Sequence, residues 1–154
     1  MKMKLNAEWV DKCIKYIKEH LHISYDTDII IDFTAQHGEF IERVQSLVKM
    51  SLFYDNEPLH PEVKQLNFLN LDFDKFNKTF LSGLWFDDVH VIGFPPANEV
   101  KKYIDAACHF AQSISVILPQ NKSDDMLFPL SYRCIFSSDL DSTMMFQIWF
   151  KADY

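Results

Sequence analysis

The 154-residue sequence predicts an α/β fold, with a mostly parallel sheet, helices on both faces and an antiparallel last strand. Two observations favour this class. Short runs rich in Ile and Val alternate with stretches whose apolar residues recur every three or four positions, as strands and amphipathic helices do. The last two strand-like runs, 132–136 and 144–149, have only a polar turn between them, so we expect them to pair antiparallel. Residues 1–154 are expected to form one domain, because this length supports a single core.

The N-terminal residues 1–22 predict an amphipathic helix that packs on the sheet. Asn6 stands at the position of an N-cap, and the apolar residues after it recur at helical spacing between charged ones. The next run, 28–33, holds three consecutive isoleucines bounded by acids and is too short for a helix. Such a run is typical of a parallel strand that is buried on both faces. Residues 51–54 predict a second short strand.

The rest of the chain repeats this alternation. Helical spacing returns at Ile41, Val44, Leu47 and Val48, and again at Val100, Tyr103, Ile104, Ala107 and Ala111. Residues 89–92 and 113–118 predict two further strands. The aromatic-rich stretch 75–87 is expected to pack in the core as a short helix or connection.

Composition restricts the partners and the compartment. The net charge of −7 and the pI near 5.2 argue against unaided binding to nucleic acid, whose phosphates are neutralised by Lys and Arg. The three cysteines are far apart, so we expect reduced thiols and an intracellular location, in the cytoplasm or the nucleus. The sequence has no apolar run of signal-peptide or membrane-spanning length, which predicts a soluble protein without a membrane partner.

The stretch after the strand at 89–92 is the most informative part of the chain. It reads Gly93, Phe94, Pro95, Pro96, Ala97. Gly93 ends the strand, and the two prolines lack a backbone N–H and keep the chain extended, so a rigid lip follows the strand. Open α/β sheets bind ligands beyond the carboxyl ends of their strands. We therefore interpret this lip as part of a candidate binding site.

With the strand before it and the run 113–119 after it, the motif resembles the S-adenosylmethionine-dependent, adenine-specific amino-methyltransferases of class I. That family carries Asn-Pro-Pro-Phe or Asp-Pro-Pro-Tyr here, and the resemblance, over residues 28–149, implies a Rossmann-like methyltransferase fold. In the family, the Asn or Asp oxygen and the first proline's carbonyl accept hydrogen bonds from the target amine, while the aromatic ring stacks on the flipped base. This chain has Phe94 at the acceptor position and Ala97 at the stacking position.

The resemblance also implies a cofactor loop. The family pattern, Asp-Pro-Ser-Ala-Gly-x-Gly-x-Phe, is matched at Asp32, Thr34, Ala35, Gly38 and Phe40, and its first glycine is Gln36 here. If that position requires a positive φ, glutamine costs about 1 kcal/mol, and its side chain would enter the space that methionine and ribose take. We therefore expect S-adenosylmethionine binding to be weak or absent, and Gln36→Gly to strengthen it. An ordinary turn between strand and helix is the alternative.

Two more residues belong to the predicted cofactor site. Asp55 follows the second strand, where related folds use an acid to hold a ribose hydroxyl, and Glu57 is the alternative acid. The resemblance places Asn67 near the adenine, where the family has an acid. Solvated turn residues are the other interpretation of these positions. No metal site is expected, because the histidines lack partners at metal-ligand spacing.

These observations leave three functional hypotheses. The leading one is a degenerate, catalytically inactive relative that acts as a binding or scaffolding subunit, partnered by an active methyltransferase subunit or by a second copy. Nucleic acid would then be reached only with a partner. The alternatives are an active S-adenosylmethionine-dependent methyltransferase on nucleic acid or another substrate, and an α/β domain without a nucleotide site. Cofactor binding discriminates between them, because the active enzyme requires it.

Overall fold

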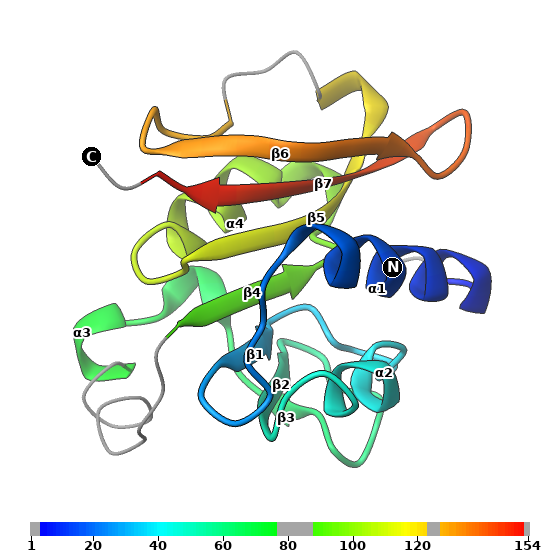
Figure 1. Cartoon of the computed structure of the whole chain (residues 1–154). Helices are drawn as coiled ribbons and strands as arrows, with labels where there is room; N and C mark the ends of the chain where they lie inside the picture. Colours follow the sequence, from blue (N-terminus) through cyan, green and yellow to red (C-terminus); the bar gives the residue numbers. More distant parts are fainter. Residues whose placement is uncertain (1–3, 77–87, 123–126, 153–154) are drawn as a thin grey trace.

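A seven-stranded sheet forms the centre of the molecule in a computed structural model, which describes residues 4–76, 88–122 and 127–152 (Figure 1). The strand order is β3-β2-β1-β4-β5-β7-β6. The strands are β1 (Ile29–Asp32), β2 (Met50–Asp55), β3 (Lys64–Gln65), β4 (Val89–Gly93), β5 (Ser113–Pro119), β6 (Tyr132–Asp139) and β7 (Met144–Lys151). Strands β1 to β5 pair in parallel, and β7 lies antiparallel to both β5 and β6. The predicted fold class is confirmed.

Helices cover both faces of the sheet. The α-helices are α1 (Ala7–His20), α2 (Ile41–Gln45), α3 (Phe73–Phe76) and α4 (Val100–Ala107), with short 3-10 turns η1 (Phe68–Asn70), η3 (Ala97–Glu99) and η4 (Gln120–Lys122). Figure 1 shows α1 in front of the sheet and α4 behind it. Strand residues alternate between the two cores: Ile30 packs with α1 and α2, whereas Ile29 and Ile31 pack with α4 and η1.

The N-terminal helix forms as its sequence predicts. The Asn6 side chain accepts a hydrogen bond from the Trp9 backbone N–H at 2.8 Å, which satisfies one of the free donors of the first turn. On its buried face, Tyr16 contacts Phe136 of β6 and Phe146 of β7, with ring centroids 4.4 Å and 6.2 Å apart. This packing holds α1 over the half of the sheet that carries the antiparallel strand.

The structure differs from the sequence-based expectation in several boundaries. Strand β3 was not expected, because its two residues are exposed and carry no apolar alternation. Helix α2 ends at Gln45, although the helical spacing continues to Val48, which is buried in the following turn. The predicted aromatic segment lies outside the described residues beyond Phe76, which is itself buried. In the described part of the chain, no helix has both the length and the hydropathy needed to cross a membrane.

Candidate functional site

A pocket of about 570 Å³ opens at the carboxyl ends of β1, β2 and β4. This is the edge at which parallel α/β sheets bind their ligands, and the volume is that of a small-molecule site. The pocket is lined by loop residues after these strands, by the segment after β3 that includes η1, and by residues of η3 and α4: Phe33, Thr34, Gln36, Asp55, Asn56, Glu57, Leu66, Asn67, Phe68, Leu69, Asn70, Pro95, Pro96, Glu99, Lys102 and Tyr103. Six of the residues predicted from sequence therefore share one cavity: Thr34, Gln36, Asp55, Asn67, Pro95 and Pro96.

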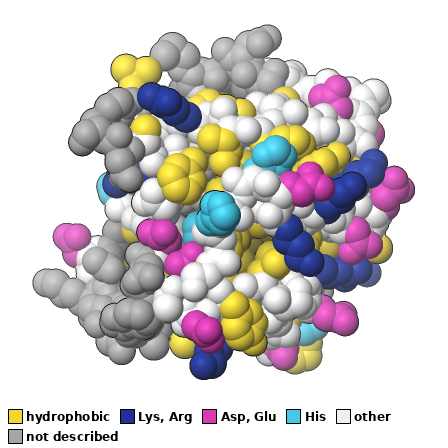
Figure 2. Space-filling view, in the orientation of Figure 1, with side chains coloured by type: hydrophobic (Ala, Val, Ile, Leu, Met, Phe, Trp, Pro, Cys, Tyr) yellow, Lys and Arg dark blue, Asp and Glu magenta, His cyan; other side chains and the backbone are white. Residues whose placement is uncertain are grey.

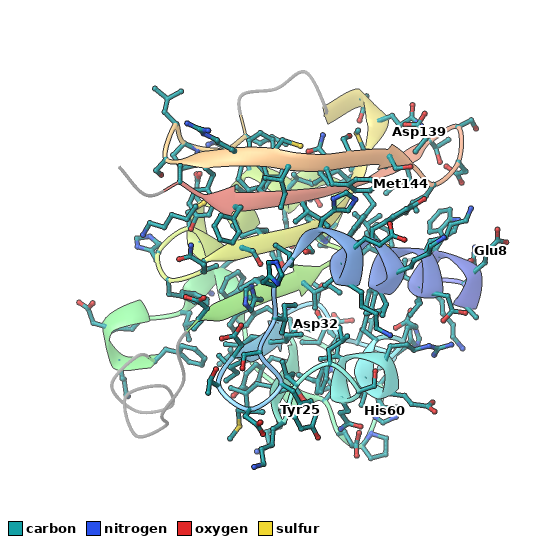
Figure 3. The ribbon with its side chains drawn as sticks, in the orientation of Figure 1. Glu8, Tyr25, Asp32, His60, Asp139 and Met144 are labelled. Carbon is teal, nitrogen blue, oxygen red and sulfur yellow. The ribbon has the colours of Figure 1, made fainter. Side chains whose placement is uncertain are left out.

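Asp32 does not line the pocket, but it is hydrogen-bonded to Thr34, which does. Asp32 is 1% exposed and lies near the centre of the molecule, at the end of β1 (Figure 3). Its Oδ1 accepts hydrogen bonds from the Thr34 backbone N–H at 2.8 Å and from the Thr34 hydroxyl at 3.1 Å. The Thr34 Oγ1 in turn accepts the Phe94 backbone N–H at 2.8 Å. Asp32 thus ties the loop after β1 to the proline motif after β4.

Gln36 does not have the strained backbone that a glycine position would impose. In the described residues, Gly38 has a positive φ, +76°, and every non-glycine residue has a negative one. The condition for a conformational cost at Gln36 is therefore not met. Gly38 is the position that requires glycine, because a Cβ there would lie 2.8 Å from the His60 ring and from Ile41 Cδ1. Ala35, which precedes Gln36, is 3% exposed and packs in the core instead of lining the pocket.

Asp55 is oriented by the backbone around it. Its Oδ2 accepts the Gln36 N–H at 3.1 Å, and its Oδ1 accepts the Glu57 N–H at 2.8 Å. The side chain is 8% exposed and lines the pocket, so its carboxylate is held in place at the wall, where it can act as an acceptor. Asn67 also lines the pocket, but it is exposed, and its Oδ1 accepts the Leu69 N–H at 3.2 Å as the cap of η1.

The proline motif splits into two parts. Pro95 and Pro96 line the pocket. Phe94 is 8% exposed and belongs to the hydrophobic core that α1 and α2 cover, and Ala97 is exposed at the start of η3. Neither of these two residues lines the pocket. Gly93 before them has no room for a side chain, since a Cβ would overlap the Tyr103 hydroxyl and lie 2.9 Å from Thr34 Oγ1.

Three aromatic residues of the pocket were not predicted from sequence as site residues. Phe33 and Phe68 stack with ring centroids 3.9 Å apart and an interplanar angle of 12°. Tyr103 is 2% exposed, and burial, followed by the charge of Asp32, raises its pKa well above the usual value, so the phenol stays neutral. The apolar spacing predicted that Tyr103 lies on the buried face of its helix, but it did not indicate the cavity beside this residue.

A second polar group lies at the opposite end of the same strands. His90 Nδ1 lies 2.7 Å from Ser113 Oγ, and His90 Nε2 lies 3.0 Å from Asp28 Oδ2. These three residues are at most 4% exposed. Potential ligand atoms of Asp28, Asp88 and His90 also come within 4.8 Å of one another, a grouping that sequence spacing did not indicate. Its members come from segments about 60 residues apart, and a hydrogen-bonded core network accounts for the His90 contacts.

The charge on the visible face is mixed. Figure 2 shows Lys and Arg side chains lying among Asp and Glu side chains around α1. Around this helix, Lys12 of α1 pairs with Glu8 at 3.3 Å, and Arg43 of α2 pairs with Asp11 of α1 at 3.2 Å. Such exposed pairs contribute little to stability, but they leave less uncompensated positive charge for a phosphate backbone.

Comparison with solved structures identifies the fold. The chain superimposes on the putative methyltransferase yhhF from Escherichia coli with a TM-score of 0.67 and 8% identity, over 99% of this chain and 90% of that one. For the 23S rRNA methyltransferase ErmE, the values are 0.65 and 6%, over 97% and 70% of the chains. For the putative methylase HI0767 from Haemophilus influenzae, they are 0.62 and 14%, over 96% and 99%. No family model and no curated protein sequence matches the chain.

The fold is therefore that of the class I methyltransferases. At these identities the likeness extends to the fold and not to the activity. The pocket residues fit an S-adenosyl nucleoside by their chemistry: the fixed carboxylate of Asp55 suits a ribose diol, and the apolar wall around Phe68 suits a base. If S-adenosylmethionine were bound there, it would supply a methyl group activated by its sulfonium.

Proposed function

We propose that this chain is a methyltransferase-like protein that does not methylate adenine and that serves as a binding or scaffolding subunit. The observation that carries the proposal is the position of Phe94. Its side chain is buried in the core on the other side of the motif, and its backbone N–H is already bonded to Thr34. The motif therefore presents two prolines to the pocket and no side-chain acceptor.

The missing acceptor matters because of the chemistry of an exocyclic amine. Its lone pair is delocalised into the base, and transfer requires that lone pair to point at the methyl group. Paired acceptors achieve this by holding both amine hydrogens. This positioning of the amine removes a large part of the activation barrier. Phe94 supplies no side-chain acceptor, and Asn98 is exposed beyond the prolines and is not part of the pocket wall. Ala97 likewise supplies no ring on which a flipped base would stack.

An active methyltransferase with a different substrate is the second candidate. The pocket itself favours it, because its wall carries the acidic side chain of Glu99 and the basic side chain of Lys102 in addition to Pro95 and Pro96. A small molecule or a protein side chain with its own nucleophile needs no amine acceptor at position 94. This candidate requires cofactor binding, whereas a scaffold does not.

Methyl transfer separates the two candidates directly. We expect no transfer of radiolabelled methyl groups from S-adenosylmethionine to adenine-containing DNA or RNA oligonucleotides, with an active adenine methyltransferase as the positive control. Transfer above background that disappears in the Pro95→Ala, Pro96→Ala double variant would overturn the inactive assignment. Transfer to a protein or small-molecule extract, but not to oligonucleotides, would favour the second candidate.

The proposed partner is another protein: an active methyltransferase subunit or a second copy of this chain. The net charge of −7 and the mixed charges around α1 support a protein partner over unaided nucleic-acid binding. Size-exclusion chromatography with light scattering checks for a second copy, with a mass near twice 18.2 kDa as the positive result.

A further inference from the structure

We infer that Gln36 is a ligand-contacting residue, whose amide oxygen accepts a hydrogen bond from a nucleoside without phosphate groups bound in the pocket. The inference rests on the proposed binding role of this pocket and adds a specificity residue to it. It also reverses an expectation from the sequence. The glycine pattern alone treats the Gln36 side chain as an obstruction and predicts that Gln36→Gly strengthens binding, whereas the present inference predicts that it weakens binding.

The first observation is an unpaired buried oxygen. Gln36 is 7% exposed, and its Oε1 is buried without a hydrogen-bond partner among the described residues. Leaving such an acceptor unpaired costs on the order of 1–3 kcal/mol. Native structures contain few of these groups, and they concentrate where a ligand, an ion or a water completes the bonding.

The second observation is that the backbone of Gln36 is fixed on both sides. Its N–H donates to Asp55 Oδ2 at 3.1 Å, and its carbonyl oxygen accepts the Leu59 N–H at 2.8 Å. The loop is therefore held where it is, and the amide can find a partner only by turning about its side-chain torsions. Gln36 forms part of the pocket wall, so a donor within the pocket is the partner that such a turn can reach.

The neighbours of Gln36 define the class of ligand. Asp55, hydrogen-bonded to the Gln36 backbone N–H, lines the same pocket with a carboxylate, so the wall contains two side chains with acceptor oxygens. A ribose with free hydroxyls supplies matching donors. Among charged side chains of the wall, Asp55, Glu57 and Glu99 outnumber Lys102, so a phosphate group would meet net repulsion. Adenosine and S-adenosylhomocysteine fit this chemistry, and ADP does not.

The test is calorimetric titration of the full chain with adenosine, S-adenosylhomocysteine and ADP. We expect the unmodified protein to bind the first two at least tenfold more tightly than ADP. Gln36→Leu keeps the approximate size of the side chain but removes the acceptor, and we expect it to weaken nucleoside binding at least tenfold. Gln36→Gly, the family residue, is expected to weaken binding as well. Gln45→Leu, an exposed glutamine at the end of α2, is the matched control and should bind as the unmodified protein does.

Four results would overturn the inference: Gln36→Leu binding as tightly as the unmodified protein, Gln36→Gly binding more tightly, ADP binding as well as adenosine, or no binding of any probe. Circular dichroism of each variant establishes that it is folded, and Gln36→Glu, which keeps an acceptor, provides a second variant that should retain more affinity than Gln36→Leu. None of these results bears on adenine methylation, so the proposed function fails only in the transfer assay.

Discussion

Polar side chains gather at both ends of the parallel strands. The two groups differ in whether their side-chain polar atoms all have hydrogen-bond partners. At the amino end, His90 bonds to Asp28 and Ser113 with both ring nitrogens, inside a sheet of Ile and Val. At the carboxyl end, Asp55 has two backbone donors, and Gln36 beside it has an oxygen without a partner among the described residues, next to a pocket of about 570 Å³.

This difference separates structure from function better than residue type does. A histidine between a serine and an aspartate carries the side chains of a hydrolase triad, but all three are buried and the histidine bonds to both of the others, so no substrate reaches them. The glutamine is chemically ordinary, but its unpaired oxygen has a structural cost that a ligand can remove. Four sets of substitutions test this contrast, with expected changes in stability that decrease from about 4 kcal/mol at His90 to about 1 kcal/mol at Gln36.

Replacing His90 breaks the closed network. We expect His90→Leu to lower the free energy of unfolding by about 4 kcal/mol, because it leaves the Asp28 carboxylate and the Ser113 hydroxyl buried without their shared partner. Urea denaturation followed by circular dichroism measures this loss. The control is His22→Leu at an exposed position, which should change stability by less than about 0.5 kcal/mol. A loss below about 1 kcal/mol for His90→Leu would mean that the network is not closed.

Restoring the family residue at the motif is expected to cost stability and return no activity. Phe94→Asn removes a buried ring from the core and places an amide there, so we expect a loss of about 3 kcal/mol in the free energy of unfolding. Ala97→Phe, at an exposed position, should be close to neutral. The same urea titrations measure both. An unchanged stability of Phe94→Asn would contradict the core position of this ring.

Replacing Asp55 tests the polar group at the carboxyl end of the strands, beside the pocket. Asp55→Asn replaces one acceptor oxygen by an NH₂ group that faces a backbone N–H, so we expect a loss of about 2 kcal/mol in stability, and about tenfold weaker nucleoside binding. Glu42→Gln, at an exposed position of α2 outside the pocket wall, is the comparison and should leave both stability and nucleoside binding unchanged. If Asp55→Asn binds nucleosides as tightly as the unmodified protein, the carboxylate does not contact the ribose.

The smallest effect has the opposite sign. Gln36→Leu removes an unpaired buried acceptor, so we expect the free energy of unfolding to rise by up to about 1 kcal/mol while nucleoside binding weakens. A side chain that serves binding at the expense of the fold gives this combination. Thermal denaturation with and without S-adenosylhomocysteine measures both quantities on one sample. A fall in stability of the ligand-free variant would mean that the glutamine oxygen already has a partner.

The sequence predicted the elements well and the directions of side chains poorly. Three isoleucines in a row indicated β1, and Asn6 indicated the start of α1, because both signals are local. The contact between His90 and Ser113 depends on the register in which β4 pairs with β5, where these residues are direct partners. No local pattern encodes that register.

The candidate site has the same limit. The resemblance implied Thr34, Gln36, Asp55, Asn67, Pro95 and Pro96 as site residues, and in the structure these six residues line one pocket. It did not indicate that Phe94 turns into the opposite core or that Gly38, and not position 36, takes the positive φ. The position of Phe94 depends on how the loops after β1 and β4 are tied together through Thr34, a contact between residues 60 positions apart.

The place of β7 has a consequence for the order in which the chain assembles. This strand lies between β5 and β6, although it follows both in sequence. During synthesis β6 leaves the ribosome before β7, the strand that joins it to the sheet, has been made. Until then the backbone hydrogen-bonding groups of β6 have no strand to pair with. When β7 is present, it pairs antiparallel with both β5 and β6, and Phe136 of β6 contacts Tyr16 of α1. A nascent chain arrested before Met144 should therefore hold the parallel strands alone and be the form that chaperones recognise.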